Sequence, residues 1–384
     1  MARLPMTIPS SLEVLTQDVP GRVLNEAFRL ACERLDRFIG ALAIETAAGL
    51  GLRAGDLAPL DRLAAERGWQ VAGALSLQWL FETLELYGEA ERRGDGWRLE
   101  CVAPPVSSAQ LRAEAERAVP TARPAYEVMA LSAHALQGVL QGDLRGEDAL
   151  FGPATMGLWF DYFSNANPHY APNNQLTALA VERAIGPRAC VLEVGGGGGS
   201  AALALFDALA QAHKPPSSYV FTELQPAFLR RGVRAIQPVL PEGCGMRSLR
   251  YDIDGDPGAQ GVEAGQFDVV FGVNTLHLAR EVVGTLQKLR TLLRPGGVLV
   301  VGELLRPTST AAVHLELPFT LLMTYGQVPP EEGIRVRPGF MSARGWRRAL
   351  ETAGFDEITV LPAEIERCAE IYPGFYCGAI TARA

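Results

Sequence analysis

Apolar residues recur every three or four positions through most of the first half of the chain. Between Gly21 and Gly49 this spacing predicts one long helix. Residues 59–99 predict a short helix, a more apolar helix over 71–87, and a hairpin of two short strands around a Gly-Asp-Gly turn. The four prolines between 103 and 124 predict a connector there. Beyond it, the same spacing predicts helices at 125–142, 154–163 and 173–186.

The pattern changes at Ala189, where short runs rich in β-branched residues begin to alternate with amphipathic segments. We expect strands at 189–194, 219–223, 246–252, 267–274 and 296–303, and helices at 201–212, 226–236 and 280–293. Such alternation is typical of the α/β class, with a parallel, doubly wound sheet and helices on both faces. It divides the chain into a helical region at 1–124, a helical linker over the active site at 125–188, and an α/β domain at 189–384.

Composition narrows the class of protein. With 48% hydrophobic and 20% charged residues over 384 positions, the chain has enough apolar material for packed cores. A net charge of −8 argues against a nucleic-acid binder, which needs a basic surface. The cysteines and histidines show no metal-site spacing, so no metal is expected. No apolar run approaches the ~20 residues of a membrane span, and the first residues lack a secretory signal, so we expect a cytoplasmic protein.

Five consecutive glycines at 195–199 lie between an expected strand and an expected helix. Glycines there let a ligand approach the backbone at a helix N-terminus, where polar and anionic groups are favoured. Together with Glu193 the run has the form E-x-G-x-G-x-G, in which the glycines are Gly195, Gly197 and Gly199. A shifted register of the same run fits the G-x-G-x-x-A pattern of dinucleotide-binding folds, so a nicotinamide oxidoreductase stays open as an alternative.

Two acids follow at the ends of the next expected strands. Glu223 ends the second strand, where a carboxylate can accept hydrogen bonds from both hydroxyls of a ribose. Asp252 follows the third strand, where it can accept from an adenine amino group. The alternative for both residues is a purely structural role as a helix cap. With the glycine run, the two acids indicate a site for a ligand that contains a nucleoside.

The order of the motifs resembles a known family. After the glycine loop and the two acids come a strand that ends in NTLH (274–277), the turn RPGG (294–297) and a strand that ends at Glu303. This order resembles that of the class I S-adenosylmethionine-dependent methyltransferases, over about residues 154–384. The resemblance implies a Rossmann-like methyltransferase sheet with S-adenosylmethionine as cofactor. It also implies a set of cofactor-binding residues: Glu193, Gly195, Gly197, Gly199, Glu223, Asp252, Ile253 and Asn274.

Two branches of that family compete. Segments 136–151 and 251–261 resemble the methyltransferase domains of polyketide synthases. The helix–helix–hairpin outline at 59–99 instead resembles the winged-helix domain of dimerising small-molecule O-methyltransferases. Both branches carry a histidine after the fourth strand and an acid at the end of the fifth, which here are His277 and Glu303.

The chemistry implied by the resemblance asks for two functions. The sulfonium donor carries its own leaving group, so the protein must align an acceptor with the methyl group and remove the acceptor's proton. We expect His277 to be the base and Glu303 to orient it; the structural alternative is a satisfied histidine and an acid that merely ends a strand.

The acceptor implied is a hydroxyl or enol oxygen of a polyketide-like or other secondary metabolite, free or bound to an acyl carrier protein. The N-terminal outline favours oxygen. A β-ketoacyl carbon stays open because it uses the same base. A non-catalytic binding protein that keeps the fold is the alternative of another class.

Two segments are expected to contact the donor or the acceptor. One precedes the glycine loop and is otherwise a turn and helix cap; the other follows the fifth strand and is otherwise core. The residues are His169, Tyr170 and Asn173 in the first segment, and Phe319, Met323 and Tyr325 in the second.

Two further features concern partners. Helix 71–87 contains no Lys or Arg, so the module around it is expected to serve dimerisation or to cover the substrate rather than to enter a DNA groove. Its apolar face and that of helix 21–49 exceed what one module needs to bury, which predicts a homodimer. A basic cluster predicts a docking site for an acidic carrier protein or a substrate anion, with a solvated helix face as the alternative. Its members are Arg335, Arg337, Arg344, Arg347 and Arg348.

Overall fold

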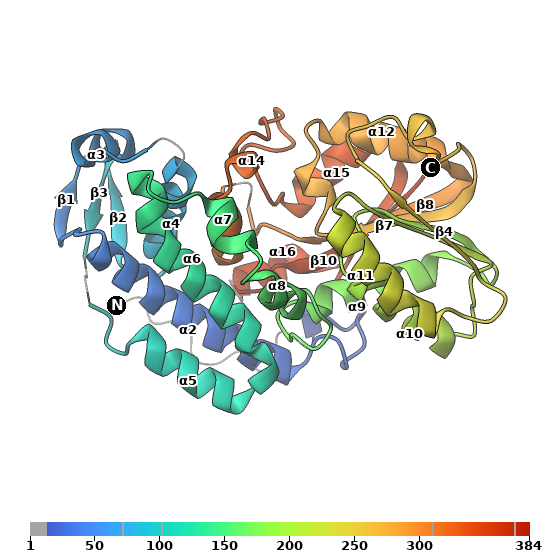
Figure 1. Cartoon of the computed structure of the whole chain (residues 1–384), viewed down its shortest axis with the longest axis horizontal. Helices are drawn as coiled ribbons and strands as arrows, with labels where there is room; N and C mark the ends of the chain where they lie inside the picture. Colours follow the sequence, from blue (N-terminus) through green and yellow to red (C-terminus); the bar gives the residue numbers. More distant parts are fainter. Residues whose placement is uncertain (1–13, 71–72, 101–102, 309, 372–373) are drawn as a thin grey trace.

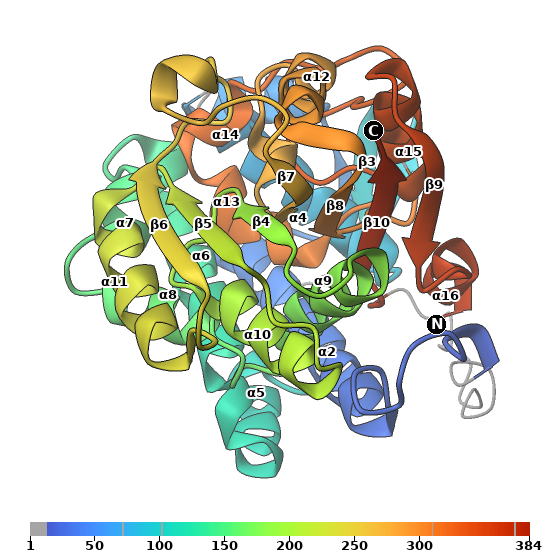
Figure 2. The ribbon, with the colours of Figure 1, turned by 90° about the vertical axis from the view of Figure 1, so that its right-hand side faces the viewer.

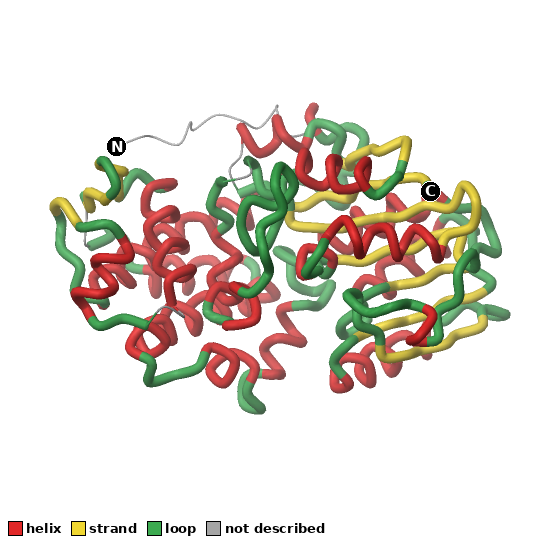
Figure 3. The backbone as a smooth tube through the Cα atoms, turned by 90° about the horizontal axis from the view of Figure 1, so that it is seen from above, coloured by secondary structure: helices red, strands yellow, loops and turns green. Residues whose placement is uncertain are grey.

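The chain folds into a helical part and an α/β part that lie side by side (Figures 1 and 3). Its structure, a computed structural model, describes residues 14–70, 73–100, 103–308, 310–371 and 374–384. The helical part comes mainly from the N-terminal half of the sequence, and the α/β part mainly from the C-terminal half. None of the helices within these ranges is long and apolar enough to span a membrane.

A seven-stranded sheet forms the centre of the α/β part, in the order β6-β5-β4-β7-β8-β10-β9 (Figure 2). The first five strands in this order are parallel, and the chain winds outward from β4 in both directions. The predicted Rossmann-like, doubly wound α/β fold is therefore confirmed. The five parallel strands are β4 (Cys190–Glu193), β5 (Ser218–Glu223), β6 (Gly245–Arg250), β7 (Phe267–Val273) and β8 (Leu293–Leu304).

The last two strands depart from the prediction of a wholly parallel sheet. β9 (Asp356–Leu361) forms one edge, and β10 (Cys377–Arg383) lies between β8 and β9 and is antiparallel to both. The sequence analysis missed β10 because its sequence, CGAITAR, has a single large apolar residue. The strand nevertheless packs in the core, where Ala379 and Ile380 are fully buried.

Helices cover both faces of the sheet (Figure 1). On one face α9 packs against α10, and α10 against α11; on the other, α12 packs against α15. Because α10 begins directly after the glycine run, its N-terminus lies at the edge where the parallel strands end. The bounds are α9 Ala171–Ala184, α10 Ser200–Gln211, α11 Pro226–Ile236, α12 Val282–Leu292 and α15 Ala343–Thr352.

The helical part begins with α2 (Glu26–Gly49), which starts where the side chain of Asn25 accepts a hydrogen bond from the Phe28 backbone N–H. The helix–helix–hairpin order expected at 59–99 is present, and strand β1 pairs with the second strand of the hairpin. The elements are β1 (Gly55–Leu57), α3 (Leu60–Arg67), α4 (Ala74–Leu86), β2 (Ala90–Arg93) and β3 (Gly96–Leu99). Because α2 packs against α4, α5 and α6, much of the apolar surface behind the dimer prediction is buried within the chain. The homodimer stays a prediction.

The stretch 103–124 is not the connector that its prolines predicted. It contains helix α5 (Ser108–Ala118), which begins where the Ser107 side chain accepts from the Gln110 N–H. The prolines lie on either side of this helix, so they bound it rather than break it. The helices that follow are α6 (Arg123–Gln141), α7 (Gly146–Phe151), which was not predicted, and α8 (Met156–Tyr162).

Two hydrophobic cores do not follow the order of the sequence. The core of the sheet includes Phe28 and Cys32 of α2 and the buried face of α9. The helical core includes residues that follow β8, such as Val313 and Leu317. A hydrogen bond joins the segment after β8 to the helical part: the Trp79 indole of α4 donates to the Val313 carbonyl at 3.1 Å. The segment after β8 thus forms a wall between the two parts.

Candidate active site

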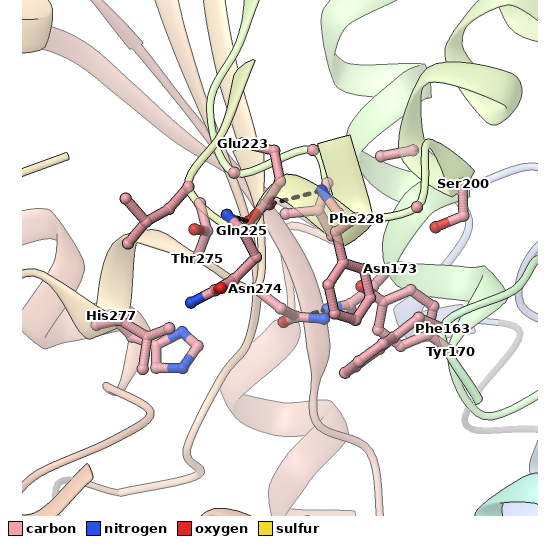
Figure 4. Close-up of a pocket in the computed structure, with 18 of the residues that line it drawn as sticks. Phe163, Tyr170, Asn173, Ser200, Glu223, Gln225, Phe228, Asn274, Thr275 and His277 are labelled. Atoms are coloured by element: carbon pink, nitrogen blue, oxygen red, sulfur yellow. Dashed lines mark hydrogen bonds between the residues drawn. The ribbon is translucent and has the colours of Figure 1, made fainter. Parts of the chain in front are cut away.

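A cavity of about 410 Å³ lies where the carboxyl ends of the parallel strands face the helical part. Each of the five parallel strands contributes lining residues at or just after its end, as a doubly wound sheet requires. Other lining residues come from 151–173 and from the segment after β8. Figure 4 shows His277 on one side of this cavity and Phe163 and Tyr170 on the other, with Asn274 between them.

The glycine loop forms the donor end of the cavity. Gly195, Gly197 and Gly199 have φ values of +64°, +54° and +88°, a region that glycine adopts without strain. A Cβ at Gly195 would overlap the Thr275 side chain, whereas a Cβ at Gly197 would meet no atom within 4 Å. The loop therefore packs tightly on the turn after β7 at Gly195 and leaves its backbone open to a ligand at Gly197.

Two acids stand beside this loop in the places predicted for them. Glu223 accepts a hydrogen bond from the Gly197 N–H at 3.0 Å and another from the Gln225 N–H at 2.7 Å. A carboxylate has about four lone-pair sites, so this anchored group can still accept from two hydroxyls. Asp252 accepts from the Asp254 N–H at 2.9 Å, and both Asp252 and Ile253 line the cavity.

Glu193 also lines the cavity, but in a different state from Glu223. It is 1% exposed and accepts a hydrogen bond from the Tyr219 hydroxyl inside the sheet. Burial raises the pKa of the Glu193 carboxyl to about 8, so the group is mostly protonated at neutral pH. Glu193 therefore lies at the end of β4, directly before the glycine loop, as a mostly neutral group.

His277 and Glu303 meet at the opposite end. The Nδ1 atom of His277 lies 2.8 Å from Oε2 of Glu303, and the two residues are 4% and 0% exposed. The other carboxylate oxygen of Glu303 accepts from the backbone N–H groups of Leu276, at 3.1 Å, and His277, at 3.3 Å. With Nδ1–H donated to Glu303, Nε2 is the nitrogen that remains for a proton from an acceptor. The ring of Phe340 packs on the imidazole, with 4.5 Å between centroids.

Asn274 joins the two ends. Its side-chain oxygen accepts from the Leu304 N–H at 3.0 Å and from the Asn173 amide at 2.9 Å. Asn274 also lies against the side chain of Tyr170, whose pKa is raised by burial. The backbone at Asn274 has φ of +49°, which asparagine tolerates better than most residues. The predicted pair Tyr170 and Asn173 is therefore placed in the cavity by one shared residue.

His169, the third residue predicted in that segment, lines the cavity as well. Its Nε2 atom is buried and finds no hydrogen-bond partner among the atoms that the structure describes. Burial lowers the pKa of this imidazole to about 4, so the ring is neutral at physiological pH.

Only one of the three residues predicted after the fifth strand lines the cavity. Phe319 does so, packed between Trp159 and Phe340. Met323 is 52% exposed at the start of α14 (Met323–Gly326), away from the cavity. Tyr325 is buried but donates its hydroxyl to Glu316 at 2.8 Å, so it serves the core. Met323 and Tyr325 therefore do not border the cavity, although the Tyr325 ring stacks on that of Phe319 with 6.0 Å between centroids.

Most of the aromatic wall was missed by the sequence analysis. The run WFDYF at 159–163 was the one signal for these residues, because so many aromatic side chains in a row are rarely all exposed to solvent. Nothing local marks the others, which lie far apart in the chain and converge only through packing. The missed lining residues include Phe151, Tyr162, Phe163, Phe228 and Phe340.

The predicted basic cluster is not a continuous surface. Arg335 is 1% exposed, and its guanidinium is bonded inside the protein. Arg337 forms an ion pair with Glu82 of α4 at 2.7 Å. These two side chains are therefore committed to the fold, and the docking site predicted for the cluster loses two of its five members.

The donor end fits S-adenosylmethionine on several counts. The open backbone at Gly197 admits a ligand, and Glu223 and Asp252 present acceptors for hydroxyl and amino groups. The cavity lining that the structure describes contains four acids and no Lys or Arg, which suits a sulfonium cation. No cluster of potential metal ligands occurs within the same described ranges.

Comparison with known proteins agrees with this geometry. Residues 192–299 match a methyltransferase domain family. The lovastatin diketide synthase mokB of Monascus pilosus is 33% identical over 185 residues, which are 47% of this chain and 7% of that synthase. The lovastatin diketide synthase lovF of Aspergillus terreus is 34% identical over 177 residues, 45% of this chain and 6% of the synthase. The match thus spans a small fraction of each of these relatives.

Solved structures share the fold over almost the whole chain, including the helical part. The CurJ carbon methyltransferase superposes with a TM-score of 0.75 at 21% identity, over 97% of this chain and 96% of that one. The DszA carbon methyltransferase gives 0.73 at 23% identity, over 99% and 97%. The matched domain and the shared fold agree with the site: residues 192–299 form a methyltransferase domain, and the chain shares its fold with two carbon methyltransferases.

Proposed function

We propose that the chain transfers a methyl group from S-adenosylmethionine to the α-carbon of a β-ketoacyl group, held as a thioester on an acyl carrier protein. One observation carries the proposal. The buried pair of His277 and Glu303 borders the same cavity as the glycine loop and Glu223. A base and a donor site in one cavity are what proton removal coupled to methyl transfer requires.

The choice of carbon rests on two lines of support. The CurJ and DszA proteins, whose folds match this chain over nearly its full length, are carbon methyltransferases. The relatives in sequence are diketide synthases, which fits a ketoacyl acceptor. The acceptor end of the cavity supports an uncharged thioester over a free acid, because the described lining there is apolar and aromatic and holds no Lys or Arg.

In this mechanism Glu303 holds the imidazole of His277 through Nδ1, so that Nε2 faces the acceptor. When bound, S-adenosylmethionine supplies an electrophilic methyl group with a neutral thioether as its leaving group. The α-proton passes to Nε2 of His277, and the electron pair of the C–H bond forms the new bond to the methyl carbon. Glu303 stabilises the imidazolium that results, and the apolar lining beside His277 limits the access of water to the carbanion equivalent.

Methylation of an enol oxygen is the second candidate. It is favoured by the helix–helix–hairpin order of the helical part, the feature from which the sequence analysis inferred oxygen. The same pair would remove the proton in either case, so the site alone does not separate the two acceptor atoms.

The test identifies the bond that forms. A β-ketoacyl thioester labelled with carbon-13 at the α-carbon is incubated with protein and S-adenosylmethionine that carries a carbon-13 methyl group. We expect a one-bond carbon–carbon coupling between the two labels in the product. A methyl signal without that coupling means oxygen methylation, and no product despite donor binding contradicts both candidates. Repeating the reaction with the thioester on a carrier protein and with the free β-keto acid tests the carrier, and the free acid is expected to react poorly.

A further inference from the structure

Arg335 is buried beside the catalytic pair, although the mechanism above gives it no role. Its side chain is 0% exposed, in a protein whose arginines otherwise lie mostly at the surface. It belongs to the segment after β8, which also supplies Phe340, the ring packed on His277. Nothing in the segment's sequence, GIRVRPGF at 333–340, distinguishes this arginine from Arg337 two positions later.

The guanidinium of Arg335 binds the backbone of the turn that carries His277. Nη1 donates to the carbonyl of His277 at 3.1 Å and to that of Ala279 at 2.7 Å. Nη2 donates to the carbonyl of Arg280 at 2.9 Å and to Glu331 at 2.8 Å. Nε donates to the Pro329 carbonyl at 3.1 Å. All three guanidinium nitrogens therefore donate hydrogen bonds, and three of the five bonds go to backbone carbonyls of the turn at 277–280.

That turn has no regular element to hold it. After β7 the chain forms a single 3-10 turn at Leu276–Leu278 and reaches α12 only at Val282. The carbonyls of 277, 279 and 280 point to one side, where a planar guanidinium with five N–H groups can bind them together. Glu331 closes the arrangement, because its Oε1 atom also accepts from the Val282 N–H at 2.8 Å.

We propose that Arg335 is a positioning residue: it fixes the turn at 277–280 and so holds the imidazole of His277 against Glu303. The proposal rests on the proposed function, in which His277 is the base. It assigns to the segment after β8 a second task beyond lining the acceptor end. Lysine cannot replace arginine here, because one ammonium has three donors and no planar fork.

Two variants from the same segment test this. Arg335→Lys keeps the charge and removes the fork, while Arg337→Ala removes a guanidinium that binds Glu82 and not the turn. At saturating substrates we expect Arg335→Lys to lower kcat by about 10–100-fold, because small displacements of a catalytic group are costly. The acceptor KM and the donor Kd should stay within about two-fold, since their binding groups are untouched. Arg337→Ala should leave kcat within about two-fold.

A second readout needs no acceptor. The chain has five histidines, so protein labelled with carbon-13 at histidine Cε1 gives five signals, and His277→Ala identifies the one of interest. We expect that signal to move or split in Arg335→Lys while the other signals stay in place, and none to move in Arg337→Ala. A normal kcat and an unmoved His277 signal in Arg335→Lys overturn the proposal. If the wild type methylates nothing, the proposed function fails, and the His277 signal still decides the role of Arg335.

If Arg335→Lys does not fold, a milder substitution tests the same contact. Glu331→Gln keeps an oxygen for the Val282 N–H but removes the charge that pairs with Arg335. If Arg335→Lys changes all histidine signals, Glu331→Gln should still displace the His277 signal alone and lower kcat by about 2–10-fold. No change in either quantity overturns the proposal.

Discussion

The two ends of the cavity are built in different ways. The donor end comes from three successive strand ends, in which the glycine loop, Glu223 and Asp252 follow one another along the chain. The acceptor end joins His277 to Phe340 and Phe319, which return to the cavity from the segment after β8. Backbone and carboxylates dominate the first, whereas side-chain packing and one buried base dominate the second.

The difference separates binding from chemistry. Donor recognition depends on a few local groups that each anchor to their own loop, such as Glu223 on the Gly197 N–H. The base depends on long-range contacts, because Glu303, Arg335 and Phe340 all act on His277 from other segments. Substitutions at one end should therefore change donor affinity, and those at the other should change the rate.

The largest effect is expected for His277→Ala. Removing the base should lower the methylation rate by about 10²–10⁴-fold, the usual contribution of general-base catalysis. Donor affinity should stay within about two-fold, because no donor group is lost. Single-turnover kinetics and donor titration calorimetry on the same preparation measure the two quantities. A near-normal rate would remove His277 as the base and leave catalysis by alignment alone.

Glu303→Gln should cost less, about 10–100-fold in rate, since the imidazole stays but loses its charged partner. The carboxylate is 0% exposed and accepts three hydrogen bonds, of which a glutamine oxygen can keep some. The double variant with His277→Ala should be barely slower than His277→Ala alone, because groups that act as a unit are not additive. Additive losses in the same single-turnover assay would show that the two residues act independently.

At the donor end, Glu223→Ala should weaken S-adenosylmethionine binding by about 10–100-fold, since a charged acceptor for two hydroxyls is lost. The rate at saturating donor should change little, which is the reverse of the pattern expected for His277. Calorimetry gives the affinity, and circular dichroism checks the fold. Unchanged affinity in a folded variant would remove Glu223 from the donor site.

The same contrast decided what the sequence could predict. The glycine loop, Glu223, Asp252, His277 and Glu303 follow strand ends, and strand ends of a doubly wound sheet meet at one edge whatever the packing is. The aromatic wall and Arg335 could not be predicted, because their positions depend on how the segment after β8 returns to the helical part. Strand β10 was missed for a related reason: its small residues carry no local signal of burial.

Phe319 and Met323 sharpen the comparison within one segment. Phe319 lines the cavity and Met323 does not. Phe319→Ala should raise the acceptor KM by about 3–10-fold through lost apolar contact, with the donor Kd unchanged. Met323→Ala is the matched control and should alter neither constant. Steady-state kinetics with the thioester acceptor check both, and equal effects of the two substitutions would place the acceptor elsewhere.

The smallest effect separates Glu193 from Glu223 at the donor end. Burial raises the pKa of Glu193 to about 8 in the folded chain, while an unfolded glutamate titrates near ~4.3. Between these values the folded chain binds more protons than the unfolded one, so this residue lowers stability as pH rises and the loss levels off above about 8.

Glu193→Gln keeps an oxygen for the Tyr219 hydroxyl and does not ionise. The variant should approach the wild type near pH 4, where the wild-type carboxyl is largely protonated in both states, and should be the more stable of the two at pH 9, with donor affinity nearly unchanged. Urea unfolding across this range measures the difference. A variant that loses stability with pH as steeply as the wild type would show that Glu193 is ionised in the folded chain, and its role would then resemble that of Glu223.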